Sequence, residues 1–79
     1  MTTYALHSAD KSKVMQIVSR TKMIRPLAIK PVYAAVLTDG RGEYYSAEIV
    51  LQAGGNYIAY AVNAYATKSE AERDAAARR

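Results

Sequence analysis

The sequence predicts a single small α+β domain in which two helices cover one face of a three-stranded antiparallel sheet, in the order α-β-β-β-α. Three features support this prediction: an amphipathic segment after residue 12, two glycine-containing turns between apolar segments, and an alanine-rich segment that begins with a helix cap. The 79 residues leave room for one domain with a marginal core. We expect residues 10–79 to form this domain and residues 1–9 to be a tail or an additional N-terminal edge strand.

The first helix is expected over residues 13–22, with Ser8 or Asp10 as its cap. At about 100° per residue, one face of this helix is apolar and carries Val14, Ile17, Val18 and Thr21. The opposite face is polar and carries Lys13, Gln16, Ser19 and Arg20. This division predicts one side that packs on the sheet and one that faces water or an anionic partner.

Prolines and glycines delimit the predicted sheet. Pro26 and Pro31 disfavour a helical conformation at Arg25 and Lys30, so the first helix must end before Arg25. Strands are expected over residues 32–38, 44–52 and 57–65, with turns at residues 39–42 and 53–56. The second of these strands alternates between apolar and polar side chains, which is typical of an antiparallel strand buried on one face.

The second helix is expected to begin at Thr67. Thr67 and Glu70 have the spacing of a capping box, and strong helix formers follow to the end of the chain. The inner stripe of this helix consists of Ala71 and Ala75, whose methyl groups allow close approach to the sheet but remove little apolar surface from water. We expect this helix to act as a thin cover.

Positive charge is concentrated in residues 10–30, where six Lys and Arg residues face one Asp and the net charge is +5. The remainder of the chain has a net charge of −1. An anionic partner is therefore expected to meet the N-terminal third of the chain.

Several positions resemble the double-stranded RNA-binding domain family. Pro31 and Tyr33 resemble its Pro-x-Tyr motif, Gly40 its loop glycine and Tyr45 its strand-two aromatic residue, and residues 67–76 resemble its C-terminal helix motif. The resemblance covers residues 10–79 and implies binding to double-stranded or structured RNA, through the shape and phosphates of an A-form duplex.

The resemblance also implies roles for particular residues. Gln16 would read a minor groove between Lys13 and Arg20, and Arg41 would enter the next groove. Lys68, with Arg73 one turn on, would hold phosphates at the helix N-terminus. On the RNA hypothesis, Lys22 at the end of the first helix and Arg25 and Lys30 in the loop after it would add to this RNA-binding surface.

A protein-binding role is the alternative, because the second helix departs from the family motif. Glu70 and Glu72 add negative charge to the phosphate-binding segment, and Arg78 and Arg79 stand where the family has apolar anchors. The module would then be a homodimer, an adaptor or a small inhibitor that occupies the nucleic-acid-handling surface of a larger complex. Its interface would use exposed tyrosines, namely Tyr44, Tyr60 and Tyr65. Single-strand binding by base stacking on tyrosines ranks lowest, because the predicted strands contain Glu48 and no basic residue.

The sequence does not favour an enzyme, a cofactor, a small-molecule substrate or a membrane protein. His7 is the only histidine and has no nearby carboxylate or second ligand, so we expect a surface or packing role for it. The absence of cysteine excludes disulfides and thiolate metal sites. No segment has the length of an apolar membrane span or the pattern of a secretory signal, so a soluble intracellular protein is expected.

Overall fold

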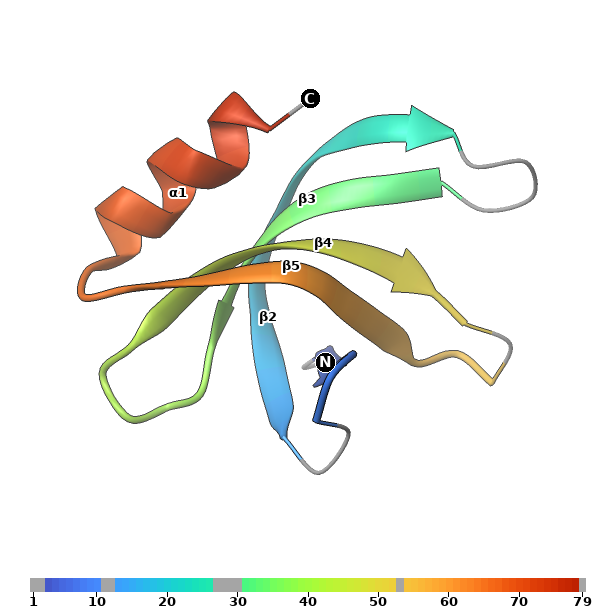
Figure 1. Cartoon of the computed structure of the whole chain (residues 1–79), viewed down its shortest axis with the longest axis horizontal. Helices are drawn as coiled ribbons and strands as arrows, with labels where there is room; N and C mark the ends of the chain where they lie inside the picture. Colours follow the sequence, from blue (N-terminus) through green and yellow to red (C-terminus); the bar gives the residue numbers. More distant parts are fainter. Residues whose placement is uncertain (1–2, 11–12, 27–30, 53, 79) are drawn as a thin grey trace.

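The fold is a closed five-stranded barrel with one helix on its outer surface (Figure 1). The computed structural model describes residues 3–10, 13–26, 31–52 and 54–78, and the side chains of residues 25 and 26 are not part of this description. Its elements follow one another along the chain as β1 (Tyr4–His7), β2 (Val14–Pro26), β3 (Pro31–Thr38), β4 (Tyr44–Leu51), β5 (Tyr57–Tyr65) and α1 (Lys68–Ala77).

Consecutive strands pair antiparallel, and β1 pairs with β5 in parallel to close the barrel. A meander with an odd number of strands can close only through one parallel pair, because its first and last strands run in the same direction. The expected additional N-terminal strand therefore exists, but it closes a barrel and does not extend the edge of an open sheet. The predicted α-β-β-β-α fold is wrong.

The predicted first helix is wrong because residues 14–26 form β2. This strand pairs with β1 and β3 and has register shifts between Ile17 and Ser19, Arg20 and Lys22, and Met23 and Arg25. Each shift inserts an additional residue, so the residues in register with the inward-facing Leu37, Ala35 and Tyr33 of β3 are three residues apart: Ile17, Arg20 and Met23. Met15, two residues before Ile17, pairs with Ala5 of β1 and is also in the interior. This spacing imitates the three-to-four-residue period of a helix. The β-branched Val14, Ile17, Val18 and Thr21 also fit a strand better than a helix.

The other predicted elements are present with small changes in their bounds. The strands expected over residues 32–38, 44–52 and 57–65 correspond to β3, β4 and β5, and the expected second helix corresponds to α1. Thr67 caps α1 by accepting a hydrogen bond from the Glu70 backbone N–H. The sheet curls into a barrel, so its two faces become an interior and an outer surface.

Small side chains make this narrow barrel possible. Four alanines lie in its interior together with the larger Met15, Leu37, Tyr45 and Ile49. A second cluster on the outer surface joins Ala34 and Val36 of the barrel to Ala71 and Ala75 of α1. The expected alanine stripe of the helix is therefore buried, and it faces the outside of the barrel.

Arg78, the residue after α1, holds the helix against a bulge in β5. Ala61 has a positive φ of 52°, within an irregularity of the pairing between β4 and β5. The Arg78 guanidinium donates from Nε to Ser46 Oγ at 2.8 Å, and from Nη2 to the carbonyl oxygens of Ser46 at 3.0 Å and Ala61 at 2.7 Å. It also forms ion pairs with Glu48 at 3.6 Å and Asp74 at 3.4 Å. We call these contacts the Arg78 clasp.

The Arg78 clasp predicts a dependence of stability on acid. A hydrogen bond from Ser46, followed by the charge of Arg78, lowers the pKa of Asp74 below its ordinary value of 3.8. An acid whose pKa is lower in the folded state adds stability above the unfolded-state pKa and loses it as the pH falls through the folded value. We expect the free energy of unfolding to fall below about pH 4, and to fall less steeply in an Asp74→Asn variant. Denaturant titrations at several pH values between 2.5 and 7 measure the slope of the free energy of unfolding against pH. Glu72→Gln, which removes an exposed carboxylate from the same helix, is the control, and equal slopes in the two variants would contradict the prediction.

Candidate nucleic-acid interface

Arg20 lies at the centre of an aromatic site formed by β2, β3 and β5. The register shifts of β2 bring Arg20 opposite Ala35, whose side chain belongs to the barrel interior. The guanidinium group lies over the ring of Tyr33, 4.4 Å from its centroid, and Nη1 donates to the Tyr57 hydroxyl at 3.2 Å. A cation in this position is attracted by the ring, and the hydrogen bond fixes its orientation.

A pocket of about 280 Å³ adjoins this arrangement and is lined by Thr3, Ile17, Arg20, Ile49 and Tyr57. We call it the Arg20 pocket. Two exposed apolar residues belong to the same surface: Met23 pairs with Tyr33 and is 54% exposed, and Leu51 pairs with Tyr57 and is 42% exposed. The site thus combines a planar cation, two half-buried rings and an apolar border.

The remaining β2 residues expected to bind RNA lie in different surroundings. The Lys22 ammonium group donates to the Ala76 carbonyl oxygen at 2.8 Å, where it meets the negative end of the α1 dipole. Gln16 is exposed and pairs with both Tyr4 and Thr38. The backbone of Arg25 belongs to β2, but its side chain lies outside the described residues, as does the whole of Lys30.

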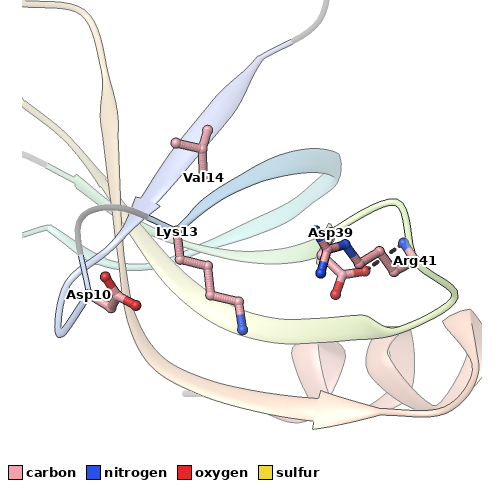
Figure 2. Close-up of a pocket in the computed structure, with 5 residues that line it drawn as sticks. All are labelled: Asp10, Lys13, Val14, Asp39 and Arg41. Carbon is pink, nitrogen blue, oxygen red and sulfur yellow. Dashed lines mark hydrogen bonds between the residues drawn. The ribbon is translucent and has the colours of Figure 1, made fainter.

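Lys13 and Arg41 lie on opposite sides of a pocket at the end of the barrel where β2 begins (Figure 2). They line this pocket of about 420 Å³ with Asp10, Val14 and Asp39, and Figure 2 shows Asp39 and Arg41 across it from Asp10 and Lys13. The Lys13 ammonium group lies 5.1 Å from the centroid of the Tyr45 ring. Burial, and then the hydrogen bond that Tyr45 donates to Asp39, raise the pKa of Tyr45 to about 12. We call this site the turn pocket.

The structure does not bring all the predicted cations together. Lys68 and Arg73 are exposed on α1, which packs against the outer surface of the barrel, whereas Arg20, also exposed, lies on the face of β2 that is in register with the interior residue Ala35. The tyrosines expected at a protein interface also separate. Tyr44 and Tyr65 pack beside the contact between α1 and the barrel, and Tyr60 is 43% exposed on β5.

Comparison with known proteins assigns the chain neither a family nor a function. No family model, curated protein or solved structure matches the chain. Within the described residues, no group of three or more His, Asp or Glu side chains is arranged to hold a metal ion, and no helix is both long and apolar enough to cross a membrane.

Sequence reasoning missed Tyr33 and Tyr57 as partners of Arg20. Tyr57 is 37 residues from Arg20 along the chain, so their contact depends on the closure of the barrel. The available signal was the charge of residues 10–30 next to aromatic strands, but a helical assignment of β2 separated that charge from the sheet. His7 has a structural role: its Nδ1 accepts hydrogen bonds from the backbone N–H groups of Ala9 at 3.1 Å and Asp10 at 3.3 Å.

Proposed function

We propose that this protein binds single-stranded nucleic acid along β2, with an unpaired base stacked in the Arg20 pocket. The observation that supports the proposal is the stacking of the Arg20 guanidinium on Tyr33 beside Tyr57. Unstacked bases pack on aromatic rings and on guanidinium planes, whereas lysines and arginines nearby attract the phosphate backbone. The site combines the Arg20 guanidinium of β2 with the Tyr33 ring of β3 and the Tyr57 ring of β5.

The correction of β2 changes the ranking of the nucleic-acid hypotheses. Single-strand binding ranked lowest because the predicted strands lacked basic residues, and β2 now brings Arg20 and Lys22 into the sheet. Duplex recognition depended on a helix that presents Gln16 to a minor groove. Gln16 belongs to a strand, so the geometrical basis for A-form recognition is lost while the positive charge remains.

A structural role for the β2 cations is the main competing explanation. β1 pairs with β2 only over Val14–Gln16, and beyond Ile17 the described residues give β2 no strand partner other than β3. Charged side chains and bulges on such an edge prevent pairing with other chains. If this were their only role, Arg20 would not affect nucleic-acid binding more than another exposed arginine does.

Protein binding is the second candidate function, and it has a different surface. Tyr4 and Val14 are each 52% exposed and Tyr60 is 43% exposed, on β1, β2 and β5. Leu6 pairs with both Val14 and Ile58, which makes the apolar surface continuous across the strands that close the barrel. Exposed tyrosines of this kind are enriched at protein interfaces.

The test is the anisotropy of labelled 12-nucleotide RNA and DNA strands and a 20-base-pair RNA duplex, titrated at two salt concentrations. We expect single strands to bind more tightly than the duplex, with affinity that falls as salt rises. Arg20→Ala should weaken single-strand binding by about fivefold or more, because it removes a stacking surface as well as a charge. Arg73→Ala removes an exposed arginine from α1 and should change affinity by less than about twofold.

Three results would overturn the single-strand proposal. Equal effects of Arg20→Ala and Arg73→Ala would indicate attraction by overall charge without a stacking site. Absence of binding at low salt would favour the protein-binding function and the surface that contains Tyr60. A preference for the RNA duplex would restore the A-form hypothesis on a barrel fold.

A further inference from the structure

The turn pocket is a second site that the proposed function does not use. It lies between the turn that joins β1 to β2 and the turn that joins β3 to β4. Lys13 immediately precedes β2, and Arg20 lies seven residues further along the chain, about 20 Å at the rise of a strand. A short single strand can therefore reach both the Arg20 pocket and the turn pocket.

The first side of the turn pocket is fixed by backbone hydrogen bonds. The His7 N–H donates to the Lys13 carbonyl oxygen, and the Lys13 N–H donates to the Asp10 carbonyl oxygen, each at 3.0 Å. The His7 ring accepts two further N–H groups within this turn. These bonds hold Asp10 and Lys13 together, and Figure 2 shows both side chains on the same side of the pocket.

The second side is a tight turn with its own network. Asp39 Oδ1 accepts the Arg41 backbone N–H at 2.8 Å, and Asp39 Oδ2 accepts the Tyr45 hydroxyl at 3.0 Å. Gly40 and Gly42 have φ angles of 79° and 94°, which other residues rarely adopt. Asp39 is therefore held within its own turn, and Arg41 makes no side-chain hydrogen bond within the described part of the chain.

The charges of the turn pocket select the chemistry of its ligand. Lys13 and Arg41 favour an anion, and Asp10 and Asp39 favour hydrogen-bond donors. A simple anion would meet both carboxylates, and a simple cation would meet both basic groups. A nucleotide satisfies both kinds of group when its base carries an amino group, as cytosine and adenine do and uracil does not.

We infer that the turn pocket is a nucleotide subsite in which Lys13 and Arg41 hold a phosphate and Asp10 accepts a hydrogen bond from the amino group of a base. This inference rests on the proposed single-strand function and adds base preference to it. The Arg20 pocket stacks any base because every base has a π-face. The turn pocket favours cytosine over uracil, because a carboxylate facing the uracil oxygen lacks a donor.

The experiment compares the affinities of 12-nucleotide cytidine and uridine RNA strands at pH 7.5 for the protein and four variants. The unmodified protein should bind the cytidine strand about tenfold more tightly, the effect of one hydrogen bond to a charged group. Asp10→Ala should reduce this ratio to about one without weakening binding to the uridine strand. Lys13→Ala and Arg41→Ala should weaken binding to both strands, and Arg20→Ala should weaken both while keeping the ratio. Thermal melting identifies any variant that fails to fold, and Asp10→Asn then tests the same position with a smaller change.

The possible failures are distinguishable. If both strands bind equally and Arg20→Ala weakens both, the base preference of the turn pocket is overturned and the single-strand function remains. If Asp10→Ala leaves a cytidine preference unchanged, the preference arises elsewhere and the role of Asp10 is overturned. If neither strand binds, both proposals are overturned.

Discussion

Replacing Arg78 with alanine should lower the free energy of unfolding by about 2–4 kcal/mol, and the melting temperature by roughly 10–20 °C. The Arg78 side chain is 11% exposed, so its bonds are largely removed from water. Its loss leaves the buried Ser46 without its guanidinium donor and removes the donor to the Ala61 carbonyl oxygen. The carboxylate of Glu48 loses its ion pair with the helix end. The remaining contacts of α1 with the barrel consist mainly of alanine methyl groups and the hydrogen bond from Lys22 to Ala76, which cannot compensate for these losses.

Thermal and denaturant unfolding of three variants test the Arg78 clasp. Arg73→Ala is the matched control, since it removes an exposed arginine of the same helix and should change stability by at most about 0.5 kcal/mol. Arg78→Lys should be little more stable than Arg78→Ala, because an ammonium group cannot reproduce the planar arrangement of guanidinium donors to Ser46 and Ala61. If Arg78→Ala and Arg73→Ala had equal effects, the alanine contact alone would hold the helix.

The start of α1 could be predicted from the sequence because its signals are local. Thr67 and Glu70 are three residues apart, and the structure confirms the cap: the Glu70 N–H donates to Thr67 Oγ1 at 3.3 Å. The box is altered in one detail, since the Thr67 hydroxyl donates to the Glu70 carboxylate at 2.9 Å. The buried Ala71 and Ala75 also follow directly from helical spacing.

Barrel closure and the Arg78 clasp could not be predicted from local patterns. β1 and β5 pair through residues about 50 positions apart, and nothing in the weak alternation of residues 1–9 specifies a parallel partner. From the sequence alone, Arg78 would be expected to be an exposed charge. Its role depends on the carbonyl groups of Ser46 and Ala61, which converge only because β5 contains a bulge.

The candidate site could be predicted in part. The net charge of residues 10–30 predicts that an anionic partner meets this segment, and the structure adds that Arg20, one of the predicted binding residues, lies beside Tyr33 and Tyr57. The surroundings of Arg20 could not be predicted, because bulges in β2 decide which residues turn inward. A strand with inserted residues and an amphipathic helix have nearly the same spacing of apolar side chains, so periodicity alone cannot separate them.

Substitutions at the neighbouring residues Val14 and Met15 distinguish a strand from a helix in this segment. Met15 is fully buried in the barrel, whereas Val14 is 52% exposed on its outer surface. The helical prediction has Val14 on the apolar face. We expect Met15→Ala to lower the free energy of unfolding by about 2–4 kcal/mol, because it removes core contacts and leaves a cavity. Val14→Ala should change it by at most about 0.5 kcal/mol.

Denaturant unfolding of both variants, with circular dichroism as the probe, gives the two free energies under the same conditions. A small effect of Met15→Ala with a large effect of Val14→Ala would require a helix at residues 13–22 and would remove Arg20 from the aromatic site. The expected order supports the strand, and with it the register that places Arg20 opposite Ala35 and beside Tyr33 and Tyr57. This measurement requires no ligand, so it tests the structural basis of the proposed nucleic-acid interface independently of binding.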